Sequence, residues 1–199
     1  MNQGKTKKHP KERIKRAAIQ LFSEKGYSAT TMRQIAKRAG LASGSIYNHV
    51  KRKSDLLLEI HRNFVDEIID KTRFKKNDES SCEEKLREVF KTFMKSIFEN
   101  KLSFKILLEQ EAFLPPAAKR EVVRNGNLLK EGIERIIRTG IKRGEIREVD
   151  TKMATYCVFA ICNYTLRWIN PKGMYTYEQL GELFFDFFFE GIKKTPFSS

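Results

Sequence analysis

The chain has 199 residues, of which 40% are hydrophobic and 32% are charged, and this is enough to bury a sizeable core. Its longest apolar runs fall short of a membrane span, and its three cysteines form neither a disulfide framework nor a metal-ligand spacing, so we expect a cytoplasmic protein. Of the net charge of +14, residues 1–76 hold 19 Lys and Arg against 7 Asp and Glu, which indicates a module that binds a polyanion such as nucleic acid or an anionic membrane surface.

The first predicted helix is amphipathic and follows a basic arm over residues 1–10. Its apolar residues recur at the spacing of one helical face, namely Ile14, Ala17, Ala18, Leu21 and Phe22. Gly26 ends this helix. Thr31 begins a second helix, because Gln34 lies three residues later and completes a capping box. Gly40 ends it by supplying the left-handed conformation that a sharp turn needs.

The remaining elements are also predicted to be helical. A short third helix begins at Ser43, with Ile46 and Val50 facing inward, and a long fourth helix covers residues 54–74. After the polar run at 75–81 we expect five more helices, of which the second is short and centred on residues 104–108. The prediction is therefore an all-α fold of about nine helices.

Residues 31–50 have the pattern of a helix-turn-helix, since two short helices are joined by a glycine turn and packed on a preceding helix. In such a unit the second helix enters the major groove of DNA. Here that helix carries small or hydrogen-bonding residues: Ser43, Gly44, Ser45, Tyr47, Asn48 and His49. The free backbone N–H groups at a helix N-terminus favour phosphate, and Thr31 and Lys53 present similar features at the starts of the neighbouring helices.

The segment TTMRQIAKRAGLASGSIYNHVKRKSDLL, residues 30–57, closely resembles the helix-turn-helix signature of TetR/AcrR-type bacterial transcriptional regulators. The match includes the threonine pair, I-A, A-G, Y-x-H and K-x-x-L, and residues 17–27 fit the family's first helix. Val50 stands where the family often has phenylalanine. The resemblance implies a DNA-binding domain over residues 10–56 and a helical ligand-binding and dimerisation domain over residues 57–199.

The resemblance also implies a role for each matched position. Phosphate contacts are expected of Thr31, Tyr47, His49 and Lys53, phosphate or base contacts of Arg33 and Ser43, and approach to base edges of Gly44, Ser45 and Asn48. Asn48 is the best base reader by chemistry, because an amide can pair with adenine. Purely structural roles are open alternatives, since Thr31 and Ser43 could only cap helices and His49 could only pack in the turn.

The C-terminal part carries more apolar surface than a one-sided helix needs. Residues 153–168 are apolar nearly all round and the last helix has a broad phenylalanine face, so burial in a ligand cavity, a second subunit or a large core is expected. The resemblance implies that the last two helices pair with their copies in a homodimer, with candidate interface residues Phe159, Leu180, Phe184, Phe187 and Phe188. A small ligand would be lined by Phe93, Phe104, Leu107, Phe159, Asn163, Arg167 and Trp168.

The tail Thr165–Ile192 is similar to that of a subgroup of these regulators that controls fatty-acid or other acyl-CoA breakdown. An apolar acyl chain would suit phenylalanine-rich walls, and Arg167 would meet an anionic head group. The expected function is thus a ligand-responsive repressor that binds a palindromic double-stranded DNA operator as a homodimer, without cofactor, metal or membrane.

Two other function classes fit the residues less well. An enzyme is disfavoured, because three histidines are scattered along the chain and neither a nucleophile–base pair nor a phosphate-binding glycine loop is present. A basic protein-interaction or membrane-surface helical protein, without specific DNA recognition, would use the same charge. It would not need the ordered turn and helix of residues 41–50.

Overall fold

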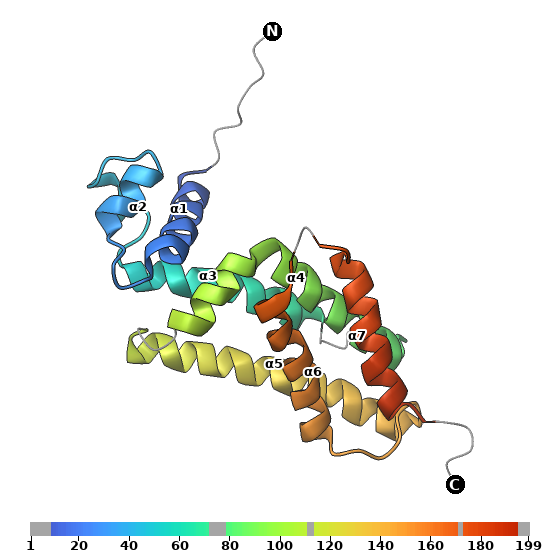
Figure 1. The fold of residues 1–199 in the computed structure, drawn as a ribbon. Coiled ribbons are helices and arrows are strands. Elements are labelled where there is room, and N and C mark those ends of the chain that lie inside the picture. The colour runs from blue at the N-terminus through green and yellow to red at the C-terminus, as the bar shows by residue number, and fades with distance from the viewer. Residues whose placement is uncertain (1–8, 72–78, 111–113, 171–172, 195–199) are drawn as a thin grey trace. The chain divides into compact units, whose positions relative to one another are not determined.

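The computed structural model describes residues 9–71, 79–110, 114–170 and 173–194 (Figure 1). Within these ranges the regular elements are helices joined by turns and loops, and the one β-type pairing is an isolated bridge between Ile146 and Lys193. The all-α prediction is confirmed. The α-helices are α1 (Pro10–Lys25), α2 (Met32–Arg38), α3 (Lys53–Lys71), α4 (Cys82–Gln110), α5 (Pro116–Arg143), α6 (Thr151–Trp168) and α7 (Tyr177–Ile192), and a short 3₁₀ helix, η1, covers Ser45–Asn48.

Two compact units are formed by the chain. The first lies within residues 1–62 and 102–122, and the second within residues 63–101 and 123–199. The helices α3, α4 and α5 therefore each run from one unit into the other. The sequence-based division at residue 56 stays a prediction.

The core of the first unit is built on α1. All five residues of the predicted apolar face, Ile14, Ala17, Ala18, Leu21 and Phe22, are buried. Ile35 and Ala36 of α2 join them, as do Ile46 and Val50, both predicted to face inward. The same core takes in Leu114 and Ala118 from the region around the start of α5, which the sequence did not indicate.

The helix boundaries differ from the prediction in two places. The third helix is only one 3₁₀ turn, because Gly44 and its small neighbours offer few side chains to support a longer helix. Residues 81–110, predicted as two helices, form the single helix α4. The helix continues because residues 98–103, between the two predicted helices, contain no glycine or proline to interrupt the backbone hydrogen bonds.

In the second unit, α7 packs closely on α4. A Cβ added at Gly181 would lie 2.9 Å from Cα of Lys91, so glycine is needed for this approach. Phe90 of α4 contacts the rings of Phe185 and Phe188 at centroid distances of 6.3 and 5.6 Å. Glu182 of α7 accepts hydrogen bonds from Arg87 and Lys91 of α4. The hydrogen bond from Lys91 is the main cause that lowers the pKa of Glu182. These contacts fix which face of α7 is buried.

Candidate nucleic-acid interface

The start of α2 is capped as the sequence predicts. The Thr31 hydroxyl accepts a hydrogen bond from the backbone N–H of Gln34 at 3.2 Å, and the Thr31 N–H donates to Oε1 of Gln34 at 2.9 Å. Both Thr31 and Arg33 are exposed. The capping role of Thr31 is therefore confirmed, and its phosphate contact stays a prediction that the exposed position permits.

The predicted DNA-contacting residues of the turn lie on the exposed side of one short segment. Ser43, Gly44, Tyr47 and Asn48 are exposed, whereas Ser45 and His49 are half-buried. Tyr47 keeps 54% of its surface, although Ile46 beside it is completely buried. Ile46 is buried in the core, whereas Tyr47 beside it is exposed, so the six positions lie together in one short segment that is mostly exposed.

Lys53 is engaged in a different contact from the one expected. Its ammonium donates hydrogen bonds to the backbone carbonyl oxygens of Tyr27 at 2.5 Å and Thr30 at 2.8 Å, and it lies 4.2 Å from the centroid of the Tyr27 ring. Burial lowers the pKa of Lys53. The phosphate contact expected of Lys53 stays a prediction, and the structure shows its charge held by the loop before α2.

Sequence reasoning missed Arg13. Its guanidinium reaches from α1 to the other end of α2 and donates hydrogen bonds through Nη2 to the carbonyl oxygens of Ala39 and, at 3.0 Å, of Gly40. Gly40 has φ +67°, which confirms the predicted left-handed turn. No sequence signal marks Arg13, because its partners are backbone atoms 26 and 27 residues away.

The structure describes five of the seven predicted ligand-lining side chains, and their role stays a prediction. Phe93 is buried and meets Phe159 edge to face, with centroids 5.8 Å apart. Asn163, Arg167 and Trp168 lie exposed on α6, and Trp168 packs against the ring of Phe184. Phe104 and Leu107 belong to α4, but their side chains lie outside the described residues.

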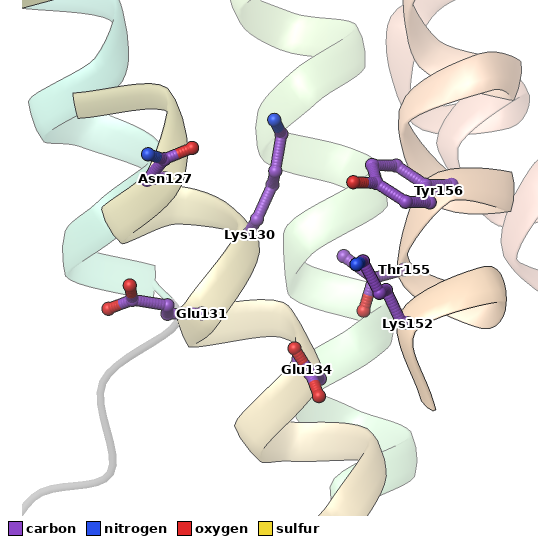
Figure 2. A pocket seen from close by; sticks show the side chains of 7 residues that line it. All are labelled: Asn127, Lys130, Glu131, Glu134, Lys152, Thr155 and Tyr156. Atoms are coloured by element: carbon purple, nitrogen blue, oxygen red, sulfur yellow. The ribbon is translucent and has the colours of Figure 1, made fainter. Parts of the chain in front are cut away.

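A small pocket of about 120 Å³ lies between α5 and α6 in the second unit (Figure 2). In Figure 2 the side chains of Lys130 and Tyr156 approach each other from the two helices, and the Lys130 ammonium lies 5.8 Å from the ring centroid. The pocket is lined by residues with polar or charged groups, namely Asn127, Lys130, Glu131, Glu134, Lys152, Thr155 and Tyr156. None of the predicted ligand residues is among them.

The last two helices leave an apolar surface uncovered. Large exposed apolar side chains on α6 and α7 are Met153, Tyr156, Tyr164, Trp168, Leu183 and Phe187, with Phe187 71% exposed. Of the other residues predicted for a dimer interface, Phe159 and Phe184 are half-buried, and Leu180 and Phe188 are buried within the second unit. Within the described ranges, no helix has the length and hydropathy needed to cross a membrane.

Comparison with known proteins agrees with this arrangement of an exposed helix-turn-helix and a helical second part. A model of the bacterial regulatory proteins of the tetR family matches residues 14–60, and a model of the tetracyclin repressor-like C-terminal domain matches residues 79–192. The chain belongs to the TetR family. This TetR-family protein is a DNA-binding transcriptional regulator and not an enzyme, and the interaction or membrane-surface alternative is not favoured.

Among its relatives is the HTH-type transcriptional repressor KstR2 of Mycolicibacterium smegmatis, 26% identical over 93% of this chain and 91% of the relative. The fatty acid metabolism regulator protein of Bacillus subtilis strain 168 is 27% identical over 88% of this chain and 92% of the relative.

Solved structures share the fold. The ketosteroid transcriptional regulator KstR2 of Mycobacterium tuberculosis superimposes with a TM-score of 0.82 at 24% identity, covering 94% of this chain and 97% of that one. AibR, in complex with isovaleryl coenzyme A and operator DNA, superimposes with a TM-score of 0.75 at 20% identity, covering 91% and 98%.

Proposed function

We propose that this TetR-family protein is a cytoplasmic homodimeric repressor that binds a palindromic operator and responds to a small apolar ligand. DNA binding is assigned to residues 10–56, and ligand binding and dimerisation to residues 57–199. The observation that carries the proposal is the turn at η1, where polar side chains project outward around a buried Ile46.

The DNA-contacting residues have different tasks. Thr31, Tyr47 and His49 would contact phosphates and so fix the position of the protein on the duplex, whereas Gly44, Ser45 and Asn48 would approach base edges and select the sequence. Arg33 and Ser43 lie where either kind of contact is possible. The expected phosphate contact of Lys53 stays a prediction beside its contacts with backbone carbonyls.

A homodimer is supported by the exposed apolar surface of α6 and α7. Side chains as exposed as Tyr164 at 65% and Phe187 at 71% are costly to leave in water when they lie on neighbouring helices. A twofold interface made by these helices would cover them and would present two helix-turn-helix units. Two such units match the two half-sites of a palindrome.

An acyl-CoA is the ligand class we propose. Its support is the isovaleryl coenzyme A in the complex of the structural neighbour AibR and the fatty-acid regulator among the relatives. The pocket in Figure 2, of about 120 Å³, is too small for this ligand, since pockets for small molecules commonly measure about 300–1,000 Å³. Contacts of the ligand with Phe93, Phe104, Leu107, Phe159, Asn163, Arg167 and Trp168 stay predictions.

The ligand would act by favouring one arrangement of the helices over another. Because α3 and α4 continue from the second unit into the first, a ligand bound to one arrangement of them would change the spacing of the two DNA-binding units. A ligand with equal affinity for both arrangements would have no effect.

The test is to select duplexes from a random-sequence library and from fragments of the host genome, and to measure their affinity for the full-length protein. Affinity should fall steeply with rising salt, because neutralised phosphates release counterions. The double variant Tyr47→Ala, His49→Ala should fold and bind about ten-fold or more weakly. Tyr175→Ala, which removes an exposed tyrosine outside the helix-turn-helix, is the matched control.

Titration with isovaleryl-CoA, palmitoyl-CoA and free CoA then tests the ligand. At least one acyl-CoA should change duplex affinity, and free CoA should not. Wild-type affinity in the folded double variant would refute the assignment of the DNA-binding surface. Absence of any response to the CoA esters would refute the ligand class alone.

A further inference from the structure

The helix α2 depends on its neighbours for its position. It has seven residues, far fewer than a helix needs to be stable by itself in water. It also contacts both α1 and η1, so any displacement of α2 displaces the turn that is proposed to read DNA. What holds its two ends therefore matters for DNA binding, and this inference rests on the function proposed above.

The loop before α2 is held by Lys53, the first residue of α3. Three backbone carbonyls of this loop accept hydrogen bonds from the Lys53 ammonium, those of Tyr27, Ser28 and Thr30, at 2.5, 3.4 and 2.8 Å. The Tyr27 ring closes one side of the site at 4.2 Å, a distance suited to a cation–π contact. An ammonium has three donors, and the three carbonyls use all of them.

The same loop is also tied to α1. The buried Thr30 hydroxyl lies 2.8 Å from the carbonyl oxygen of Gly26 and 3.2 Å from that of Leu21, the two acceptors of its hydrogen bonds. The residue that follows Thr30 is the N-cap of α2. The start of α2 is thus fixed by contacts with α1 and α3 together.

The end of α2 is held by Arg13. Carbonyl oxygens in the last turn of a helix have no hydrogen-bond donor within the helix. The Arg13 guanidinium is the donor for the carbonyl oxygens of Ala39 and Gly40. Its positive charge also suits the negative end of the helix dipole. A Cβ added at Gly40 would lie 2.6 Å from Nη2 of Arg13, so the guanidinium is packed directly against the turn.

We propose that Arg13 and Lys53 are positioning residues for DNA binding. Each directs its charge to backbone carbonyls at one end of α2, and together they set where η1 stands relative to α1 and α3. On this proposal Lys53 supports the phosphate- and base-contacting residues without being one of them.

The test compares two duplexes, the one that the wild-type protein selects from a random-sequence library and a scrambled duplex of the same length. Binding to the scrambled duplex depends mainly on phosphate charge, whereas binding to the selected duplex also depends on correctly placed base contacts. Variants Arg13→Met and Lys53→Met should lose about ten-fold or more in preference for the selected duplex.

Matched controls remove the same charge nearby. Arg16→Met lies on the same helix as Arg13, and Lys51→Met lies two residues before Lys53; both control residues are exposed. Each positioning variant should bind the scrambled duplex as its control does, with the same dependence of affinity on salt. All variants are measured at 10 °C after circular dichroism has shown that they are folded.

Charge-conserving variants provide a second series, which also serves if a methionine variant does not fold. In Arg13→Lys, the shorter ammonium side chain cannot reach both carbonyls with the geometry of the guanidinium. In Lys53→Arg, the planar guanidinium does not fit the three carbonyls that surround the ammonium of the wild-type residue. Both should lose preference for the selected duplex at unchanged net charge. A phosphate contact by residue 53 would instead survive replacement by arginine.

Three results would overturn the inference. Lys53→Met could weaken binding to both duplexes equally and lower the slope of log affinity against log salt concentration by about 1.8 per dimer more than Lys51→Met does. In that case Lys53 contacts phosphate. If the folded variants keep the wild-type preference, the two residues serve stability alone. If the wild-type protein selects no duplex, the proposed function fails and this inference fails with it, whereas the first two results leave that function standing.

Discussion

The replacement of Gly40 by alanine would test the contact between Arg13 and the end of α2. Gly40 closes α2 with a pair of backbone hydrogen bonds, Leu41 N–H to Ala36 O at 2.9 Å and its own N–H to Lys37 O at 3.1 Å. At the end of α5, Gly144 closes its helix in the same way, with bonds of 2.9 and 3.0 Å from residues 145 and 144. The two glycines also have similar φ angles, +67° and +74°.

The two sites differ in what surrounds the glycine. At Gly144 nothing lies within 4 Å of an added Cβ, whereas at Gly40 the Cβ would lie 2.6 Å from Nη2 of Arg13. Gly144→Ala should therefore cost only the strain of a left-handed alanine, about 1 kcal/mol. Gly40→Ala should cost about 2–3 kcal/mol, because displacement of Arg13 also weakens its hydrogen bonds to two carbonyls.

The assay is urea unfolding of the full-length protein at one fixed concentration, followed by far-ultraviolet circular dichroism. A double-mutant cycle with Arg13→Met separates the two contributions. In the Arg13→Met background the collision is gone, so Gly40→Ala should cost about as much as Gly144→Ala, near 1 kcal/mol. An equal cost of Gly40→Ala in both backgrounds would refute the reasoning, as would equal costs of Gly40→Ala and Gly144→Ala in the wild type.

Three further predictions concern the second unit. Gly181→Ala should destabilise the protein by about 1–3 kcal/mol in urea unfolding, because its Cβ would meet the backbone of α4 at 2.9 Å, whereas Gly191→Ala on the same helix meets nothing within 4 Å and should be neutral or stabilising. The pKa of Glu182 is lowered in the folded state, so its contribution is complete above the ordinary value of 4.5 and is lost as pH falls below it; Glu182→Gln should remove less than about 1 kcal/mol at pH 7 and flatten the pH dependence between pH 3 and 5. Phe187→Asp should convert the proposed dimer to monomer in light scattering, whereas Met174→Asp, at a still more exposed position outside α6 and α7, should leave the mass unchanged.

The features that the sequence predicted well are those set by local chemistry. The capping box of Thr31 and Gln34 was predicted because its two residues lie three positions apart, and it is present in the structure. Ser81, Asp150 and Thr176 cap the starts of α4, α6 and α7 by contacts of the same short range. The glycine turn at Gly40 was predicted for the same reason, since its requirement for positive φ is local. Such signals need no knowledge of the rest of the chain.

The register of α7 shows where periodicity fails. Phenylalanine occupies positions 184, 185, 187, 188 and 189, so apolar residues lie on almost every face of this helix. Their spacing therefore does not show which face is buried. Phe187 was predicted for the dimer interface, and this stays a prediction. In the structure Phe185, Phe188 and Phe189 are buried, whereas Phe187 is 71% exposed. Only the packing against α4 decides between these faces, through Gly181 and the ring contacts of Phe90.

The carbonyl contacts of Arg13 and Lys53 were beyond sequence reasoning for a similar cause. From the sequence, a basic residue near a helix-turn-helix is predicted to contact a DNA phosphate, because the sequence gives only the type and charge of the side chain. Whether the cation faces solvent or backbone depends on the packing of α1, α2 and α3. For Lys53 the structure shows three carbonyls and an aromatic ring around the ammonium.

The start of α5 suggests how a ligand signal could reach the DNA-binding residues. By sequence this region belongs to the part matched by the C-terminal family model, but Leu114 and Ala118 are buried in the same core as α1 and α2. Glu121 of α5 also forms a two-bond ion pair with Arg62 of α3, one bond measuring 2.7 Å. Close-packed cores change between discrete arrangements and do not stretch, so a ligand that shifted α5 along its axis would repack this core. Ligand and DNA would then act on the same core, and reciprocity requires that operator binding change the affinity for the ligand by the same factor by which the ligand changes the affinity for the operator.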